Sequence, residues 1–130
     1  MELDGVLVKE IAEHGLREFP NEACGLVAGP DGAAKFFGMK NLEASPVSYR
    51  LDPKEQLRVF DLIDEEGWEL LGIVHTHTHS EAYPSETDRK LAFYPDSLYL
   101  IMSLSDRENP VLRAFRIVDD RITEEELVIT

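Results

Sequence analysis

The sequence predicts an α/β fold (α+β, mixed sheet), in which helices flank a curved sheet. Two segments, 8–19 and 52–66, repeat apolar residues at three- and four-residue steps, which is the spacing of one helix face. Short apolar runs bounded by turn residues lie around these segments and indicate strands. The last three runs follow one another with no helix between them, which favours a mixed-sheet sandwich over a purely parallel sheet.

The first part of the chain is predicted to form a helix, a buried strand and two weaker strands. The helix runs from Val8 to Phe19, and Pro20 ends it because proline cannot continue the hydrogen-bond pattern. The segment from Glu22 to Ala28 is short and apolar, and the turn sequence GPDG follows it, so we expect a buried strand there. Weaker strand candidates are AKFFGMKN and VSYRLD.

A capped helix and an apolar strand come next. Asp52 can cap a helix that has Pro53 at its first position and ends at Gly67. The sequence WELLGIVHTH then indicates a strand, and Ser85 to Phe93 a helix. The three final strands are SLYLIMSL, VLRAFRIV and RITEEELVI.

Composition and charge limit the number of domains and the kinds of partner. With 130 residues, of which 43% are hydrophobic and 30% charged, the chain is expected to form one globular domain, residues 1–130. Its 26 acidic and 13 basic residues give a formal charge of −13. This charge repels phosphate backbones and anionic membranes, so we expect neither as a partner. It favours solubility, with an electropositive docking protein as the alternative.

Cysteine content and the N-terminal sequence indicate a cytoplasmic protein. The single cysteine, Cys24, excludes an internal disulfide and a cysteine-rich zinc site. The segment MELDGVLVKEIAEH is charged and lacks the apolar core of a signal peptide, and no apolar run approaches ~18 residues.

The segment HTHTHSEAYPSETD, residues 75–88, contains the residues best suited to bind a metal. On an extended strand the Cα atoms of His75 and His77 are ~7 Å apart on one face, whereas those of His75 and His79 are ~13 Å apart. Because zinc–nitrogen bonds of ~2.0–2.1 Å bring ligand atoms close together, two neighbouring histidines can converge on one ion, whereas the outer pair cannot unless the chain bends. We therefore expect the third ligand to come from another element.

Ser85 and Asp88 stand in the S-x-x-D relation that begins a helix, and Pro84 precedes them. Alone, such a pair is usually only a helix cap, and histidines on a strand are more often solvated or packed in a core. The combination of an H-x-H pair at a strand end and an acid at a nearby helix start instead indicates zinc ligands converging from two rigid elements.

With His75 and His77 as the pair, this segment resembles the JAMM signature of the MPN-domain metallopeptidases, H-[ST]-H-P followed by S-x-x-D. Asp88 lies eleven residues beyond His77, as in that signature, and Ser85 occupies its serine position. Glu22, in NEACGLVAG, matches the early-strand glutamate of the short prokaryotic members. The resemblance covers essentially the whole chain and implies the MPN-domain fold, a cytidine-deaminase-like sandwich.

The resemblance also implies a role for each of these residues. His75, His77 and Asp88 would hold one zinc ion (Zn²⁺), which lowers the pKa of its water toward ~7 and polarises the substrate carbonyl. Glu22 would take the proton of that water and return it to the leaving amine. Ser85 would donate a hydrogen bond to the developing oxyanion.

Three residues near the motif lie outside the proposed set of ligands and catalytic groups. Thr78 stands where most members have proline. His79 could support a ligand, contact substrate or be an exposed loop residue, and the last is the preferred reading; pairing it with His77 would misplace the spacing to the acid by two. Cys24 lies on the same strand face as Glu22, and we interpret it as a small buried residue.

The short chain lacks room for the insertions of the eukaryotic ubiquitin isopeptidases. Its segments NLEASPVSYRLDPKEQLRVF and HSEAYPS resemble the actinobacterial Mec-type members, which implies release of cysteine from the C-terminus of a small ubiquitin-like sulphur-carrier protein, in cysteine biosynthesis. Candidate residues for binding the carrier tail or the cysteine carboxylate are Arg50, Ser45, Ser48 and Tyr49. Arg50 is the preferred one, because its guanidinium can donate two parallel hydrogen bonds to a carboxylate.

Two alternatives remain open. One is a general isopeptidase that removes ubiquitin-like proteins from lysine, and the other is a non-catalytic MPN scaffold. A zinc nucleoside deaminase is excluded, because its H-x-E and P-C-x-x-C pattern needs two further cysteines.

Overall fold

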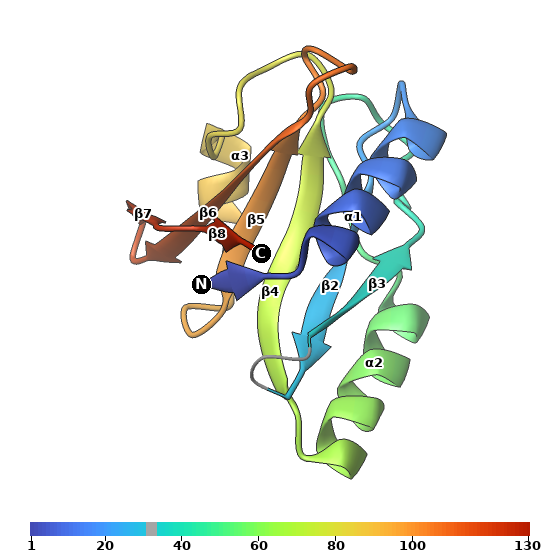
Figure 1. The fold of residues 1–130 in the computed structure, drawn as a ribbon, viewed down its shortest axis with the longest axis vertical. Helices are drawn as coiled ribbons and strands as arrows, with labels where there is room; N and C mark the ends of the chain where they lie inside the picture. Colours follow the sequence, from blue (N-terminus) through green and yellow to red (C-terminus); the bar gives the residue numbers. More distant parts are fainter. Residues whose placement is uncertain (31–33) are drawn as a thin grey trace.

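Six strands form one mixed sheet in the computed structural model, which describes residues 1–30 and 34–130 (Figure 1). The helices are α1 (Gly5–Glu18), α2 (Pro53–Glu66) and α3 (Glu86–Lys90). The strands are β1 (Glu2–Leu3), β2 (Cys24–Gly29), β3 (Lys35–Met39), β4 (Glu69–His77), β5 (Leu98–Ser103), β6 (Val111–Val118), β7 (Arg121–Glu125) and β8 (Val128–Ile129).

The sheet order is β3-β2-β4-β5-β6-β7, with β4 and β5 parallel and every other neighbouring pair antiparallel. The short strands β1 and β8 form a separate parallel pair. Helix α3 and the segments around it connect the two parallel strands, as a parallel pair requires. These pairings confirm the predicted mixed-sheet α/β class.

Alternating side chains of the central strands fill two apolar layers. On β4, Val74 packs in the layer that contains Leu7 and Ile11 of α1, whereas Ile73 packs in the layer that contains Val59 of α2. Since side chains alternate along a strand, His75 and His77 are on the same face of β4 as Ile73. The histidine pair therefore belongs to the α2 side of the sheet.

Two of the predicted helices form for the predicted reasons. The Asp52 carboxylate accepts a hydrogen bond from the Lys54 amide, Pro53 opens α2, and Gly67 ends it with a φ of 67°. Helix α1 begins earlier than predicted, because the Asp4 side chain accepts from the Val6 amide, and it ends just before Pro20.

Other predicted bounds differ from the structure. The strand predicted from Glu22 begins only at Cys24, so Glu22 lies just before β2. VSYRLD forms no strand, only an isolated Asn41–Leu51 bridge, because the Asn41 side chain binds the backbone of this segment. The helix predicted from Ser85 to Phe93 ends at Lys90, and the Ala92 amide then donates to the Arg89 carbonyl in a tighter turn. RITEEELVI divides into β7 and β8, because its second half pairs with β1. The predicted turn GPDG lies partly outside the described residues.

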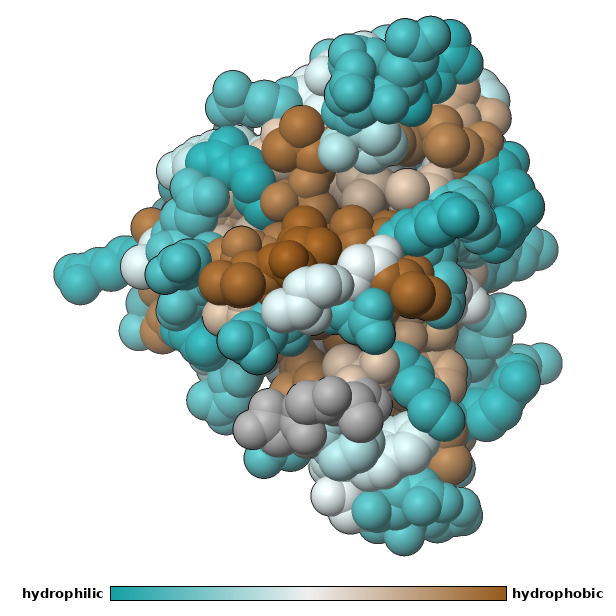
Figure 2. All heavy atoms as spheres, in the orientation of Figure 1, coloured by the Kyte–Doolittle hydropathy of each residue, from teal (hydrophilic) through white to brown (hydrophobic). Residues whose placement is uncertain are grey.

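The two chain ends close the α1 side of the molecule. The amide of Val128 donates to the Met1 carbonyl at 2.8 Å, and the Gly5 amide donates to the Thr130 carbonyl at 3.0 Å. Figure 2 shows hydrophobic side chains in a band across the middle of this face, where Figure 1 places β1, β8 and the start of α1. Exposed Val6 and Ile129 belong to these elements. Among the described residues, no helix is long and apolar enough to cross a membrane.

Candidate active site

The end of β4 brings two histidine rings together. Cys24 of β2 and Ile101 of β5 flank His75, so this histidine lies in the middle of the sheet and is fully buried. His77 is 5% exposed. Their Nε2 atoms are 3.2 Å apart, as the alternation along an extended strand predicts for neighbours on one face.

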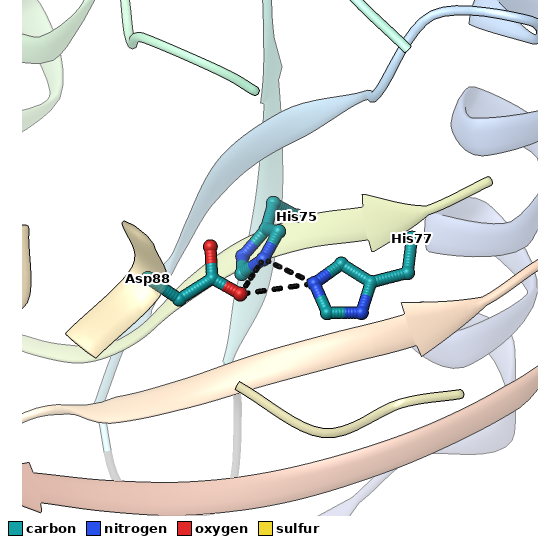
Figure 3. Close-up of side chains that lie close together, drawn as sticks. All are labelled: His75, His77 and Asp88. Carbon is teal, nitrogen blue, oxygen red and sulfur yellow. Dashed lines mark hydrogen bonds and ion pairs between the residues drawn. The ribbon is translucent and has the colours of Figure 1, made fainter. Parts of the chain in front are cut away.

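Asp88 reaches the same point from α3 (Figure 3). Its Oδ2 atom lies 2.9 Å from Nε2 of His77 and 3.2 Å from Nε2 of His75. The capping box holds this carboxylate, because Oδ2 also accepts from the Ser85 amide at 2.9 Å while the Asp88 amide donates to Ser85 Oγ at 3.1 Å.

These three atoms have the geometry of a metal ligand set. Bonds of about 2.0–2.1 Å to a tetrahedral ion place ligand atoms about 3.3 Å apart, close to the separations among His75, His77 and Asp88. Three lone-pair atoms at this distance repel one another unless a cation, either a proton or a metal ion, lies among them. Two imidazoles and one carboxylate form a donor set that suits zinc.

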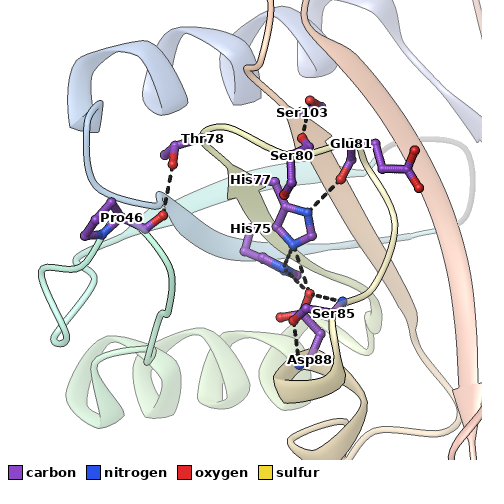
Figure 4. A network of polar contacts seen from close by, with 9 residues as sticks. All are labelled: Pro46, His75, His77, Thr78, Ser80, Glu81, Ser85, Asp88 and Ser103. Carbon is purple, nitrogen blue, oxygen red and sulfur yellow. Dashed lines mark hydrogen bonds and ion pairs between the residues drawn. The ribbon is translucent and has the colours of Figure 1, made fainter.

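Hydrogen bonds fix the His77 ring and the loop that leads to α3 (Figure 4). Nδ1 of His77 lies 2.8 Å from the Glu81 carbonyl and must donate to it, which leaves Nε2 free to bind a metal. The Ser103 hydroxyl donates to the Ser80 carbonyl at 2.6 Å and so joins the same loop to β5. The loop that leads to Asp88 is therefore anchored to the sheet.

Proton affinities at the site reflect its burial and its charges. Burial alone would raise the pKa of Asp88, but hydrogen bonds from His75 and His77 hold it well below its ordinary value. Burial lowers the pKa of His75. For His77, hydrogen bonds to Asp88 and to the Glu81 carbonyl outweigh burial and raise the pKa. The acid is thus ionised and available as a ligand at neutral pH.

Glu22 lies beside this group, in a pocket of about 290 Å³ that His77 and Ser85 also line. It is 5% exposed, and burial raises its pKa from 4.5 to about 8, with the charge of Asp88 also raising it and that of His77 opposing. The Glu22 amide donates to the Ser45 carbonyl at 2.8 Å. A carboxyl group with this pKa can gain and lose a proton near neutral pH.

The Ser85 hydroxyl can donate into the same pocket. Its oxygen already accepts from the Asp88 amide, so its single hydrogen is available to another acceptor. The structure thus brings together all five residues of the predicted motif: three as a possible metal ligand set, and Glu22 and Ser85 along the wall of the pocket next to it.

The four candidate substrate residues lie in the segment that borders the site. Arg50 is exposed and lines a second pocket, of about 510 Å³, together with Tyr49 and Phe93. The Tyr49 ring stacks on that of His75, with centroids 4.4 Å apart and an interplanar angle of 18°. The carbonyls of Ser45 and Ser48 accept hydrogen bonds from the protein itself, from the Glu22 amide and from the Asn41 side chain.

The residue at the usual proline position makes a contact that proline could not make. The Thr78 hydroxyl donates to the Pro46 carbonyl at 2.9 Å and accepts from His79 Nδ1 at 2.9 Å. His79 is exposed, lines the Glu22 pocket and lies beside the Phe19 ring. Burial raises the pKa of the Cys24 thiol to about 12, so this cysteine is protonated at neutral pH and unsuited to act as a ligand or nucleophile.

Sequence reasoning missed two polar residues that shape the site. Asn41 is 9% exposed and donates to the Glu22 carbonyl at 2.9 Å. The Thr76 hydroxyl, between the two histidines, accepts from the Ala23 amide at 2.8 Å. Thr76 lies on the face of β4 opposite the histidines, and an asparagine after a strand usually indicates a turn, so neither gave a clear signal.

Comparison with known proteins agrees with these observations. The family described as prokaryotic homologs of the JAB domain matches residues 5–118. The CysO-cysteine peptidase of Mycobacterium tuberculosis is 44% identical over 122 residues, covering 92% of this chain and 84% of that protein. A desampylase of Haloferax volcanii is 37% identical over 92 residues, covering 68% of this chain and 66% of that protein.

The fold also matches a solved structure. A solution structure from Desulfitobacterium hafniense superimposes with a TM-score of 0.88 at 36% sequence identity. The match covers 99% of this chain and 92% of the other.

Proposed function

Because this chain belongs to the prokaryotic JAB-domain family, the JAMM/MPN peptidases, we propose that it releases cysteine from the C-terminus of a small ubiquitin-like sulphur-carrier protein. The reaction is a metal-dependent hydrolysis of the bond between the carrier's terminal glycine and cysteine. The relative named CysO-cysteine peptidase is 44% identical to this chain over 122 residues, which cover most of both proteins.

The observation that carries the proposal is the convergence of His75, His77 and Asp88 beside the pocket that contains Glu22. A scaffold without catalysis has no need for three ligand atoms at 2.9–3.2 Å next to a buried acid. Keeping such an acid costs stability, because a buried carboxyl resists ionisation.

Zinc is the metal we propose for this ligand set; when bound, it supplies Lewis acidity and makes a water molecule acidic enough to act as a nucleophile near pH 7. Glu22 accepts the proton of the attacking water and returns it to the amine of the leaving cysteine. A cation at His77 and Asp88 lowers the pKa of Glu22 from about 8, which favours the base form.

Ser85 stabilises the charge that develops on the substrate carbonyl oxygen. Its hydroxyl hydrogen is free, and the capping box holds its oxygen in place before substrate arrives. A donor that is already oriented costs no reorganisation during the reaction.

The pocket lined by Arg50, Tyr49 and Phe93 is the proposed place for the end of the substrate. Tyr49 lines this pocket and stacks on the proposed metal ligand His75, so the pocket adjoins the metal site. The Arg50 guanidinium offers a paired donor for the terminal carboxylate of the cysteine. Contacts of the Ser45 and Ser48 side chains with the carrier tail stay a prediction.

A second activity is cleavage of isopeptide bonds between a ubiquitin-like protein and lysine. The similarity to a desampylase over 68% of this chain favours it. The zinc chemistry is the same, and only the leaving amine differs.

The two activities can be separated by mass spectrometry with purified substrates. A sulphur-carrier protein ending in Gly-Gly-Cys should lose one cysteine on incubation with the protein. The reaction should stop with Glu22→Gln or after chelation. If only a lysine-linked conjugate of the same carrier is cleaved, the leaving-group assignment is wrong while the peptidase assignment stands. If neither substrate is cut by the zinc-loaded protein, the proposed function fails.

A further inference from the structure

The two histidine ligands are held in different ways. A metal-bound imidazole usually donates its other ring N–H to a carbonyl, carboxylate or water, which fixes the orientation of the ring. His77 follows this pattern through the Glu81 carbonyl. In His75, by contrast, Nδ1 is buried and has no hydrogen-bond partner among the residues that the structure describes.

An aromatic ring occupies the place where such support is needed. Tyr49 lies nearly parallel to His75, with ring centroids 4.4 Å apart and an interplanar angle of 18°. A flat surface at this distance blocks rotation of the imidazole about its Cβ–Cγ bond, because the turning ring would strike it. Tyr49 can therefore fix the direction of Nε2 without a hydrogen bond.

Tyr49 is itself held by Asn41, through the peptide groups on both of its sides. The Asn41 amide nitrogen donates to the Ser48 carbonyl at 3.0 Å, and its side-chain oxygen accepts from the Arg50 amide at 3.0 Å. The Leu42 amide adds a hydrogen bond to the Arg50 carbonyl at 3.0 Å. These contacts fix the backbone that carries the tyrosine.

The same asparagine also holds the backbone of the proposed base. Its amide nitrogen donates to the Glu22 carbonyl at 2.9 Å, and its oxygen accepts from the Glu43 amide at 3.0 Å. With two donors and two lone pairs all used, this buried side chain has no freedom to turn. A saturated buried amide of this kind rigidifies the structure around it.

We propose that Asn41 and Tyr49 form a positioning unit, in which Tyr49 holds the ring of the metal ligand His75 and Asn41 holds both Tyr49 and the backbone of Glu22. The unit connects the ligand, on β4, with the base, in the segment just before β2. It rests on the proposed metal centre and does not depend on which bond the enzyme cuts.

The affinity for zinc tests this unit without any substrate. Competition with a chromophoric chelator gives the zinc dissociation constant of the wild type, Tyr49→Phe and Tyr49→Leu. Phenylalanine keeps the flat ring, so Tyr49→Phe should stay within about threefold of the wild type. Loss of the ring in Tyr49→Leu should weaken zinc binding about 10-fold to 100-fold, as is usual when the support of a ligand is removed.

A matched control is available elsewhere in the chain. Phe36 packs edge-on against His14, with ring centroids 5.6 Å apart, and neither residue belongs to the site. Phe36→Leu removes an aromatic–histidine contact away from the site and should leave zinc affinity unchanged. Equal zinc affinity of Tyr49→Leu and the wild type would overturn the proposal, whereas a wild type that binds no zinc would refute the metal centre itself.

A second measurement uses the chelated protein and a milder variant. Stacking on Tyr49 shifts the NMR signals of the His75 ring, so Tyr49→Leu should move them and Phe36→Leu should not. Asn41→Asp keeps the acceptor oxygen but loses both donors, and should also move the His75 signals and weaken zinc binding. If Asn41→Asp folds with unchanged His75 signals and unchanged zinc affinity, Asn41 is no part of such a unit.

Discussion

The buried carboxyl of Glu22 should make the metal-free protein less stable as pH rises, and Glu22→Gln should remove that dependence. Glutamine has nearly the same shape and cannot ionise. Glu22 is 5% exposed, and burial raises its pKa from 4.5 to about 8 in the folded chain. In an unfolded chain the same group has an ordinary pKa near 4.3.

The sign and size of the effect follow from proton linkage. Between the unfolded and folded pKa values the folded protein binds more protons than the unfolded chain, so the free energy of unfolding falls as pH rises through this window. With each pKa unit equivalent to about 1.4 kcal/mol, a pKa raised from 4.5 to about 8 corresponds to at most about 5 kcal/mol between pH 4 and pH 9. This is a large part of the stability of a domain of this size.

Urea denaturation of the chelated protein at pH 5, 7 and 9 measures the effect. Glu22→Gln should match the wild type at pH 5 within about 1 kcal/mol and exceed its stability by several kcal/mol at pH 9. Every other titrating group is common to both proteins, so the difference between the two curves isolates Glu22. Parallel curves for the two proteins would show that this carboxyl ionises freely in the fold, and the reasoning would be wrong.

Three further predictions concern the cap, the substrate pocket and the sheet. Ser85→Ala should lower kcat about 100-fold to 1000-fold in steady-state kinetics, but should cost only about 1 kcal/mol of stability in urea denaturation. An unchanged kcat would mean that Ser85 acts only as a helix cap. Arg50→Ala should raise KM at least about tenfold without lowering zinc content, and equal KM values would remove Arg50 from the substrate site. Gly25→Ala should cost about 3 kcal/mol in thermal or urea unfolding, because its Cβ would lie 2.4 Å from the Phe37 carbonyl oxygen; Gly67→Ala, in open space at a φ of 67°, should cost only about 1 kcal/mol.

The parts of the fold that the sequence predicted are those set by local rules. Helix α2 has its cap, its proline and its closing glycine at fixed positions, and all three act within a few residues. The two histidines converge because the strand period places them on one face, and the eleven-residue spacing places Asp88 at the first turn of α3.

The parts that could not be predicted depend on partners distant in sequence. The segment VSYRLD has the composition of a strand, but the Asn41 side chain takes the backbone groups that a neighbouring strand would have paired. The stacking of Tyr49 on His75 joins residues from a loop and a strand with no spacing rule between them. Local propensity gives no information on such contacts, which is why the surroundings of the ligands had to come from the structure.

The S-x-x-D pattern shows why a structural and a functional interpretation of one motif need not compete. A single oxygen, Oδ2 of Asp88, accepts from the Ser85 amide at 2.9 Å and lies within 3.2 Å of both histidine nitrogens. A carboxylate oxygen has two lone pairs, so one can serve the helix cap while the other serves a metal. The capping box thus determines where the ligand points, and the five-residue helix α3 holds the acid because the cap is complete. In this protein the cap is the means by which the third ligand is placed, so damage to the cap and damage to the metal site should occur together.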